Sequence, residues 1–207
     1  MPASPNTEFN AQTRRRPMRN PHRYHRNRMP KYGRTLLMGA AILISALVMA
    51  ATARGQSPRP GEIPLDNENR MHLSRGDRCP VCAMRPIKYP RFAAAIRLQD
   101  GNTFYFCSAG CMLKAWLRPD VFLGARVEDR GQPVARDYFS GRPLDARHAY
   151  WVSGSDVIGP MGPALVPLRQ RAHVDAFRRR HGGTHVFRLE DLDEDNWKTL
   201  TGKPFRF

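Results

Sequence analysis

The sequence predicts an α+β domain of two related β-β-α-β units, with helices packed on mostly antiparallel sheet, preceded by one N-terminal transmembrane or signal helix. Three observations support this fold class. One long uncharged run lies near the N-terminus, short strand-like runs are separated by Gly, Pro and Asp turns, and a helical pattern follows the second strand in each of two successive stretches.

Changes in composition divide the 207 residues into five segments. In order they are a basic cytoplasmic arm, a transmembrane anchor or signal segment, a Pro- and Gly-rich linker, an α+β domain that holds all four cysteines and a loosely ordered tail, over residues 1–34, 35–53, 54–70, 71–192 and 193–207.

Residues 35–53 carry no charge over nineteen positions, close to the ~20 residues that a helix needs to cross a bilayer. Nine Lys/Arg residues precede this run, and only Arg54 and Arg59 follow it closely. The positive-inside rule therefore predicts an inner-membrane helix with the C-terminal domain in the periplasm. The small-x-small sequence Ala51-Thr52-Ala53 leaves cleavage open, with a soluble periplasmic domain as the alternative.

The formal net charge of +16 does not indicate a nucleic-acid-binding protein. Half of the excess lies in residues 1–34, which hold nine basic residues and one acidic residue. From Arg54 onward 25 basic residues stand beside 17 acidic ones, and no nucleic-acid-binding motif accompanies them. An acidic protein partner is compatible with this surface, although the charge indicates it only weakly.

In the first unit, an Asp-Gly pair joins two strands, and Ser108 is a suitable N-cap for the helix that Pro119 ends. The expected strand, strand, helix and returning strand cover Phe92–Leu98, Thr103–Cys107, Ala109–Leu117 and Val134–Phe139.

The second unit repeats this order, with Gly182-Gly183 as the helix stop. Its helix should turn Ala172, Ala176 and Phe177 inward. The expected elements cover Ala149–Ser153, Ala164–Leu168, Gln170–Arg180 and Thr184–Leu189.

All four cysteines lie beyond the uncharged run and form two close pairs, Cys79 with Cys82 and Cys107 with Cys111. The two-residue gap of the first pair lets two sulfurs of one turn meet one ion. In the second pair, Cys107 ends a strand and Cys111 falls in the first turn of a helix, where the helix dipole should lower its thiol pKa. Two spaced pairs of this kind are a strong metal signal.

Three chemistries fit this cysteine set: a structural zinc site of four thiolates, disulfides in an oxidising periplasm, and a Cu(I) site. Methionines favour copper, because soft thioether sulfur selects Cu(I). Met84 lies two residues after Cys82, and Met161 stands among Gly and Pro at residues 159–163, where no helical stripe would bury it. Zn(II) remains the alternative metal.

Three blocks of the sequence resemble the NosL family of nitrous oxide reductase accessory proteins, which look like copper chaperones. They read CPVCAMRPIKYPRFAAAIRLQDGNTFYF from Cys79, CMLKAWL from Cys111, and ARHAYWVSGSDVIGPMGPALVPLRQRAHVDAFRRRHGG from Ala146. The resemblance implies two β-β-α-β units and a sulfur-rich Cu(I) site, with Cys82, Met84 and Met161 at the positions that match the family's motifs.

The sequence departs from that family at two places. Ala83 stands where the family usually has Gly. The pair Cys107 and Cys111 resembles the second half of small TRASH-type metal-binding modules, which leaves a four-thiolate site open beside a simple Cys/Met copper site.

The expected function is that of a membrane-anchored periplasmic metallochaperone and not an enzyme, since no Ser-His-Asp set, paired catalytic carboxylates or phosphate-binding Gly-rich loop is present. It would pass Cu(I) to an apo copper enzyme, which the resemblance identifies as nitrous oxide reductase, and meet other copper-trafficking proteins. The candidate ligands are Cys79, Cys82, Met84, Cys107, Cys111 and Met161. An exported structural zinc-binding interaction domain and a thiol oxidoreductase for copper-site assembly are the alternatives.

Overall fold

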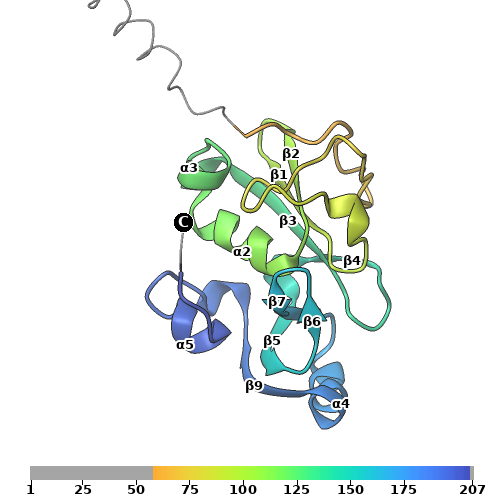
Figure 1. Ribbon diagram of the computed structural model, residues 1–207, viewed down its shortest axis with the longest axis vertical. Coiled ribbons are helices and arrows are strands. Elements are labelled where there is room, and N and C mark those ends of the chain that lie inside the picture. Colours follow the sequence, from red (N-terminus) through yellow and green to blue (C-terminus); the bar gives the residue numbers. More distant parts are fainter. Residues whose placement is uncertain (1–57, 206–207) are drawn as a thin grey trace, which may run out of the picture. The chain divides into compact units, whose positions relative to one another are not determined.

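The computed structural model describes residues 58–205 (Figure 1). The basic arm, the uncharged run at residues 35–53 and the first residues of the expected linker lie outside this range, as do residues 206–207. Gly55–Phe207 is one compact unit of the chain. Within the described residues, no helix has the length and apolar character needed to cross a membrane.

The first β-β-α-β unit is a four-stranded antiparallel sheet on which helix α2 packs (Figure 1). The strand order is β2-β1-β3-β4, so the first strand of the unit lies between the second and third. The elements are β1 (Ala94–Leu98), β2 (Thr103–Phe106), α2 (Ala109–Leu117), β3 (Arg130–Arg136) and β4 (Pro143–Asp145).

Helix α2 covers the residues expected of it. Ser108 has extended backbone angles, and its Oγ accepts a hydrogen bond from the Cys111 amide at 3.3 Å, as an N-cap residue does. Met112 and Leu113 are fully buried against the sheet. Pro119 opens the next short helix and restricts the residue before it, so α2 ends at Leu117.

The second unit repeats the topology of the first. Its strand order is β8-β5-β9, again with the first strand in the middle and every pair antiparallel. The elements are β5 (Tyr150–Ser155), β8 (Val166–Leu168), α4 (Arg171–His181) and β9 (Gly182–Phe187). The expectation of two related β-β-α-β units in an α+β domain is confirmed for the described residues.

A small hairpin interrupts the second unit between β5 and β8. It consists of β6 (Ile158–Gly159) and β7 (Gly162–Pro163), and its two-residue connection carries Met161. Gly162 adopts φ +85°, a left-handed conformation that glycine adopts without a steric penalty. The hairpin therefore presents Met161 at its tip.

Asp137 and Tyr138 join the two units. The Asp137 carboxylate accepts hydrogen bonds from the Ser140 hydroxyl at 2.6 Å and from the Arg169 amide at 2.9 Å. The Tyr138 amide donates to the Pro167 carbonyl at 3.0 Å. Side chains from both units also share one buried core, so the two sheets are held in a defined relation.

Some expected boundaries differ from the structure. The strand expected at Val134–Phe139 begins earlier, at Arg130, and ends where Asp137 turns the chain. In α4 the inward face holds Val174 and Phe177, whereas Ala172 is exposed. The larger Val side chain takes the place expected for alanine, because it buries more apolar surface.

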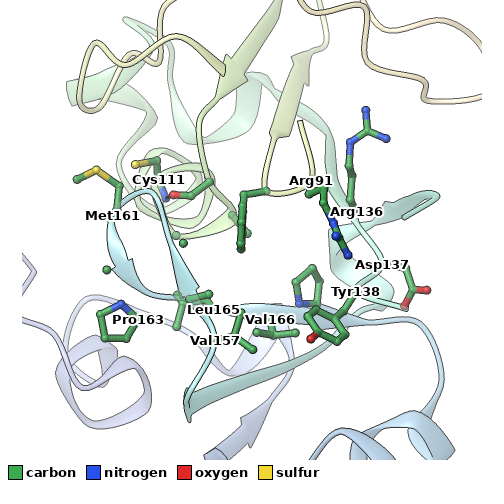
Figure 2. A pocket seen from close by; sticks show the side chains of 18 of the residues that line it. Arg91, Cys111, Arg136, Asp137, Tyr138, Val157, Met161, Pro163, Leu165 and Val166 are labelled. Atoms are coloured by element: carbon green, nitrogen blue, oxygen red, sulfur yellow. Dashed lines mark hydrogen bonds between the residues drawn. The ribbon is translucent and has the colours of Figure 1, made fainter. Parts of the chain in front are cut away.

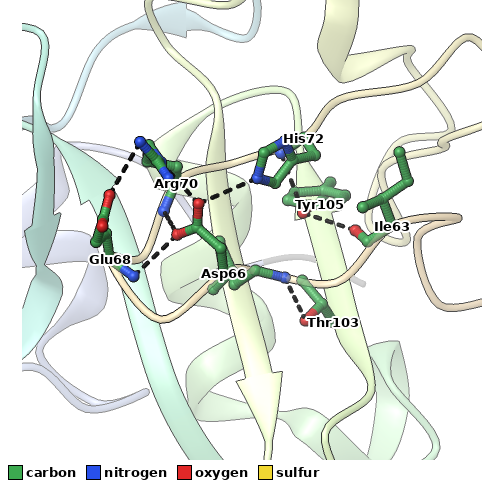
Figure 3. A network of polar contacts seen from close by, with 8 residues as sticks. Ile63, Asp66, Glu68, Arg70, His72, Thr103 and Tyr105 are labelled. Carbon is green, nitrogen blue, oxygen red and sulfur yellow. Dashed lines mark hydrogen bonds and ion pairs between the residues drawn. The ribbon is translucent and has the colours of Figure 1, made fainter.

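Residues 58–72 pack against the first sheet, whereas residues 54–70 were expected to form a linker. Leu65 is buried, the Gly61 amide donates to the Thr103 carbonyl at 2.7 Å, and the Tyr105 hydroxyl donates to the Ile63 carbonyl at 2.8 Å. Figure 3 shows how Asp66 closes this segment on itself, accepting bonds from the side chains of Arg70 at 2.7 Å and His72 at 3.2 Å.

The C-terminal segment is also ordered by packing, in contrast to the expected loose tail. Trp197 is 1% exposed and belongs to the shared core. Ser153 of β5 donates a hydrogen bond to the Leu200 carbonyl, which ties helix α5 to the second sheet. The remaining short elements are η1 (Pro86–Lys88), α3 (Pro119–Phe122), η2 (Val127–Asp129), η3 (Ala146–His148), η4 (Leu189–Asp191) and α5 (Trp197–Thr201).

Candidate metal centre

The first cysteine pair lies on a tight turn before η1. The Cys79 amide donates to the Met84 carbonyl at 2.9 Å, and the Ala83 amide donates to the Cys79 carbonyl at 2.8 Å. Ala83 has φ +59°, the left-handed conformation in which a non-glycine residue is uncommon. The turn thus folds the backbone around Cys79 and Cys82 and directs both sulfurs inward.

The second pair comes from the first unit's strand–helix junction. Cys107 follows β2 directly, and Cys111 lies in the first turn of α2 behind the Ser108 cap. The hairpin of β1 and β2 brings this junction to the turn that carries Cys79 and Cys82, so residues 25 and 29 positions apart meet.

The four sulfurs form one cluster, in which all lie within 4.8 Å of one another. Cys82 Sγ is 3.3 Å from Cys107 Sγ and 4.0 Å from Cys111 Sγ, and Cys107 Sγ is 3.8 Å from Cys111 Sγ. A tetrahedral ion with metal–sulfur bonds of about 2.3 Å separates its sulfurs by about 3.8 Å. The donor set and its spacing therefore fit a soft metal ion.

Burial makes the cluster asymmetric. Cys79, Cys107 and Cys111 are 1%, 0% and 4% exposed, whereas Cys82 is partly exposed. Among the four cysteines, Cys82 is thus the one most open to solvent.

The four thiols differ in their proton affinity. Hydrogen bonding with Cys107, and then with Cys111, holds the pKa of Cys82 well below its usual range, and the same two residues lower the pKa of Cys79. Cys107, followed by Cys79 and Cys82, raises the pKa of Cys111. For Cys107, the hydrogen bond with Cys111 lowers the pKa, but Cys79 and Cys82 outweigh it and the pKa is raised.

The lowered pKa expected for Cys111 from the helix dipole is therefore wrong. The dipole contributes a partial charge at the end of α2, whereas two sulfurs that ionise first lie close to Cys111. Cys107 and Cys111 therefore release their protons less readily than Cys79 and Cys82. A metal ion binding here displaces those protons.

The two candidate methionines lie in different surroundings. Met84 is on the same turn as Cys79 and Cys82 and packs, partly buried, against the core that contains the cysteines. Met161 comes from the second unit and is 44% exposed. Figure 2 shows Met161 at the same end of a cavity as Cys111.

That cavity has a volume of about 770 Å³ and lies between the two units. Its walls are mainly apolar, with Phe92 and Ala109 on one side and Leu165 and Val166 on the other. This size and lining are typical of a ligand-binding pocket, and Cys111 of the cysteine cluster forms part of its wall.

Sequence reasoning missed one residue of this region. Lys203, in the expected tail, donates from Nζ to the carbonyls of Met161 at 3.2 Å and Pro163 at 2.7 Å. No local pattern could have indicated these contacts, because they join residues about 40 positions apart.

Known proteins share sequence and fold with this chain. The family model NosL matches residues 70–197. The copper-binding lipoprotein NosL of Stutzerimonas stutzeri is 32% identical over 121 residues, which cover 57% of this chain and 63% of that protein. The chain thus spans less than two thirds of this relative's length.

A solved structure shares the fold. The crystal structure of the copper chaperone NosL from Shewanella denitrificans matches with a TM-score of 0.52 and 18% identity, over 63% of this chain and 99% of that one. At this identity the likeness concerns the fold alone. Because the family model covers most of the domain that holds the cysteine cluster, the chain belongs to the NosL family.

Proposed function

We propose that this protein is a Cu(I)-binding metallochaperone that delivers copper to a periplasmic copper enzyme. One observation carries the proposal: four cysteine sulfurs converge within 4.8 Å, on a fold whose named relatives are a copper-binding lipoprotein and a copper chaperone. Thiolate and thioether donors together select Cu(I) over harder ions. The proposed ligands are Cys79, Cys82, Met84, Cys107, Cys111 and Met161.

The asymmetric burial of the cluster supports transfer rather than permanent storage. Cys79, Cys107 and Cys111 are buried and would shield the ion from water, whereas Cys82 is partly exposed and Met161 is 44% exposed. A thiolate, thioether or imidazole of the recipient could approach through the cavity and displace Met161 first. Delivery then proceeds by exchange of ligands and needs no catalytic residue.

The proposed location is the periplasmic face of the inner membrane. The basic residues before the uncharged run at 35–53 support this orientation, and a lipoprotein relative supports export with a membrane attachment. A lipid anchor would require a cysteine near a new N-terminus, but the first cysteine of this chain is Cys79. The uncharged run is therefore the proposed anchor, with cleavage after Ala53 as the alternative.

The proposed recipient is apo nitrous oxide reductase, because the family takes its name from accessory proteins of that enzyme. Other copper-trafficking proteins would supply the ion. The excess of basic over acidic residues from Arg54 onward supports an acidic surface on the partner, since opposite charges speed association.

A competition titration tests the metal. Reduced, metal-free Gly55–Phe207 should take Cu(I) from a chromogenic Cu(I) chelator and prefer it to Zn(II). Met84→Leu should weaken Cu(I) binding and leave Zn(II) binding unchanged, because only the soft ion uses the thioether. Met71→Leu is the matched control, since Met71 is buried in a different core cluster. Tighter binding of Zn(II) than of Cu(I) would exclude the copper assignment.

A fusion experiment tests the compartment. Alkaline phosphatase joined after Phe207 folds only in the periplasm and should be active. Activity of a cytoplasm-dependent fluorescent protein at the same position, with an inactive phosphatase, would overturn the periplasmic assignment and the delivery role with it.

A structural zinc site is the second candidate, because the sulfur spacing also suits a tetrahedral four-thiolate centre. The thiol oxidoreductase alternative has less support. Its Cys-x-x-Cys motif opens a helix in thioredoxin-like proteins, whereas Cys79 and Cys82 lie on a turn.

A further inference from the structure

The segment that follows α5 connects the two units beside the metal cluster. On one side, the Lys114 ammonium of α2 lies 5.9 Å from the Trp197 ring centre and 5.8 Å from the Phe205 ring centre. These two rings pack edge to face at 5.2 Å. The segment is thereby attached to the helix that carries Cys111.

On the other side, Lys203 reaches the tip of the Met161 hairpin. Its ammonium donates to the Met161 carbonyl at 3.2 Å and to the Pro163 carbonyl at 2.7 Å. One cation thus holds the carbonyl groups on both sides of Gly162, whose φ of +85° forms the turn. Hydrogen bonds from a charged donor are stronger than those between neutral groups.

At its base the hairpin is held by one further backbone hydrogen bond, from the Ala164 amide to the Val157 carbonyl at 2.8 Å. Its ladder consists of two residue pairs, Ile158 with Pro163 and Gly159 with Gly162. Ile158 and Met161 are 64% and 44% exposed, so neither side chain anchors the hairpin in the core. A two-stranded hairpin of this size is not stable on its own.

We propose that Lys203 is a positioning residue that latches the Met161 hairpin over the metal cluster and so keeps the Met161 thioether available to the bound ion. This inference rests on the proposed function, because it assigns a purpose to the position of Met161. Lys203 lies beyond residues 70–197, which the family model matches.

The test compares Lys203→Met with Lys198→Met in the full-length protein. Methionine keeps the length of the side chain and removes its donors and charge. Lys198 is an exposed lysine of α5 and serves as the matched control. Amide hydrogen exchange is measured across residues 158–164 in the metal-free protein, and the rate of Cu(I) release to a chelator is measured in the loaded protein.

In Lys203→Met, exchange at the hairpin should accelerate about fivefold or more, the change expected from losing one or two hydrogen bonds, while β1 exchanges as before. Cu(I) release should also accelerate, as it should in Met161→Ala. Lys203→Arg, which retains charge and donors, should recover most of the protection. Lys198→Met should change neither measurement.

Hairpin exchange that is equal in Lys203→Met and Lys198→Met would overturn the latch. Faster exchange with unchanged Cu(I) release would overturn the positioning role, because the hairpin would then move without consequence for the ion. If Lys203→Met lowers the melting temperature of the whole domain, Lys203→Gln replaces it in both measurements, and the same results decide. The wild-type Cu(I) titration separates failure of the latch from failure of the proposed function.

Discussion

Replacing Ala83 with glycine should stabilise the metal-free domain. Ala83 lies in the turn that carries Cys79 and Cys82, with φ +59° and an exposed side chain. The left-handed conformation brings Cβ close to the backbone in any residue other than glycine. Glycine removes this contact and retains the Ala83 amide bond to the Cys79 carbonyl.

The size of the effect follows from two opposing contributions. A left-handed conformation costs an L-residue about 1–2 kcal/mol. Glycine gains freedom in the unfolded chain, which costs about 0.5–1 kcal/mol of stability. No packing is lost, because the Ala83 methyl group is exposed. The net stabilisation is therefore about 0.5–1 kcal/mol, or roughly 1–4 °C in melting temperature for a domain of about 150 residues.

Equilibrium denaturation in urea, on reduced and metal-free Gly55–Phe207, measures this difference. Asn69→Gly is the matched control, because Asn69 has φ +60° and asparagine tolerates that conformation better than alanine. The control should gain less than Ala83→Gly. The slope of unfolding free energy against urea should be the same in all three proteins.

A decrease in stability for Ala83→Gly, or a gain no larger than that of Asn69→Gly, would refute the reasoning. Either result would mean that the turn does not hold Ala83 in a left-handed conformation when the metal is absent. The positions of Cys79 and Cys82 would then depend on the ion.

Three further predictions follow from the site and from the junction of the two units. Cys82→Ser should abolish high-affinity Cu(I) binding but lower the stability of the metal-free domain by less than about 1 kcal/mol, since Cys82 is partly exposed. Unfolding of the Cys82→Ser domain, seen by circular dichroism, would favour a structural zinc site. Met161→Ala should raise the Cu(I) dissociation constant about tenfold without changing the melting temperature, and equal affinities would remove Met161 from the ligand set. Asp137→Asn should destabilise the domain by about 1–3 kcal/mol at pH 7, whereas the exposed Asp195→Asn should not. Burial raises the pKa of Asp137, but hydrogen bonds from Ser140 and Arg169 outweigh this effect and lower the pKa overall. The stabilisation by the Asp137 carboxylate is therefore present above the unfolded pKa of about 3.9 and is lost as the pH falls through the folded pKa. A stability deficit of Asp137→Asn that persists at the lowest pH would contradict this.

The local features of this protein could be predicted from its sequence. Helix α2 begins at Ser108 and ends before Pro119, because an N-cap side chain and a proline act on the backbone next to them. The β1–β2 hairpin forms at the Asp-Gly pair for the same reason. The spacing of Cys79 and Cys82 sets their relation within one turn.

The sequence also predicted a cluster of the four cysteines, because two closely spaced cysteine pairs are typical of a metal site. The distances between the two pairs could not be predicted, because Cys82 and Cys107 come together only after β1 and β2 pair and α2 packs on the sheet. The direction of the Cys111 pKa shift depends on the contact between the two pairs. The helix dipole alone predicts a lowered pKa for Cys111, whereas the neighbouring sulfurs raise it.

Only the tertiary structure decided how residues 58–72 and 193–205 pack on the two sheets. Leu65 and Trp197 lie in segments whose polar composition indicated a linker and a tail, yet both are buried by contacts with distant strands and helices. The contacts of Lys203 could not be predicted either, since they join its ammonium to two carbonyl groups about 40 residues earlier in the chain. Local sequence determines the conformation of neighbouring residues, whereas a contact between remote residues exists only when the whole core has formed, because its energy is coupled to all the other contacts.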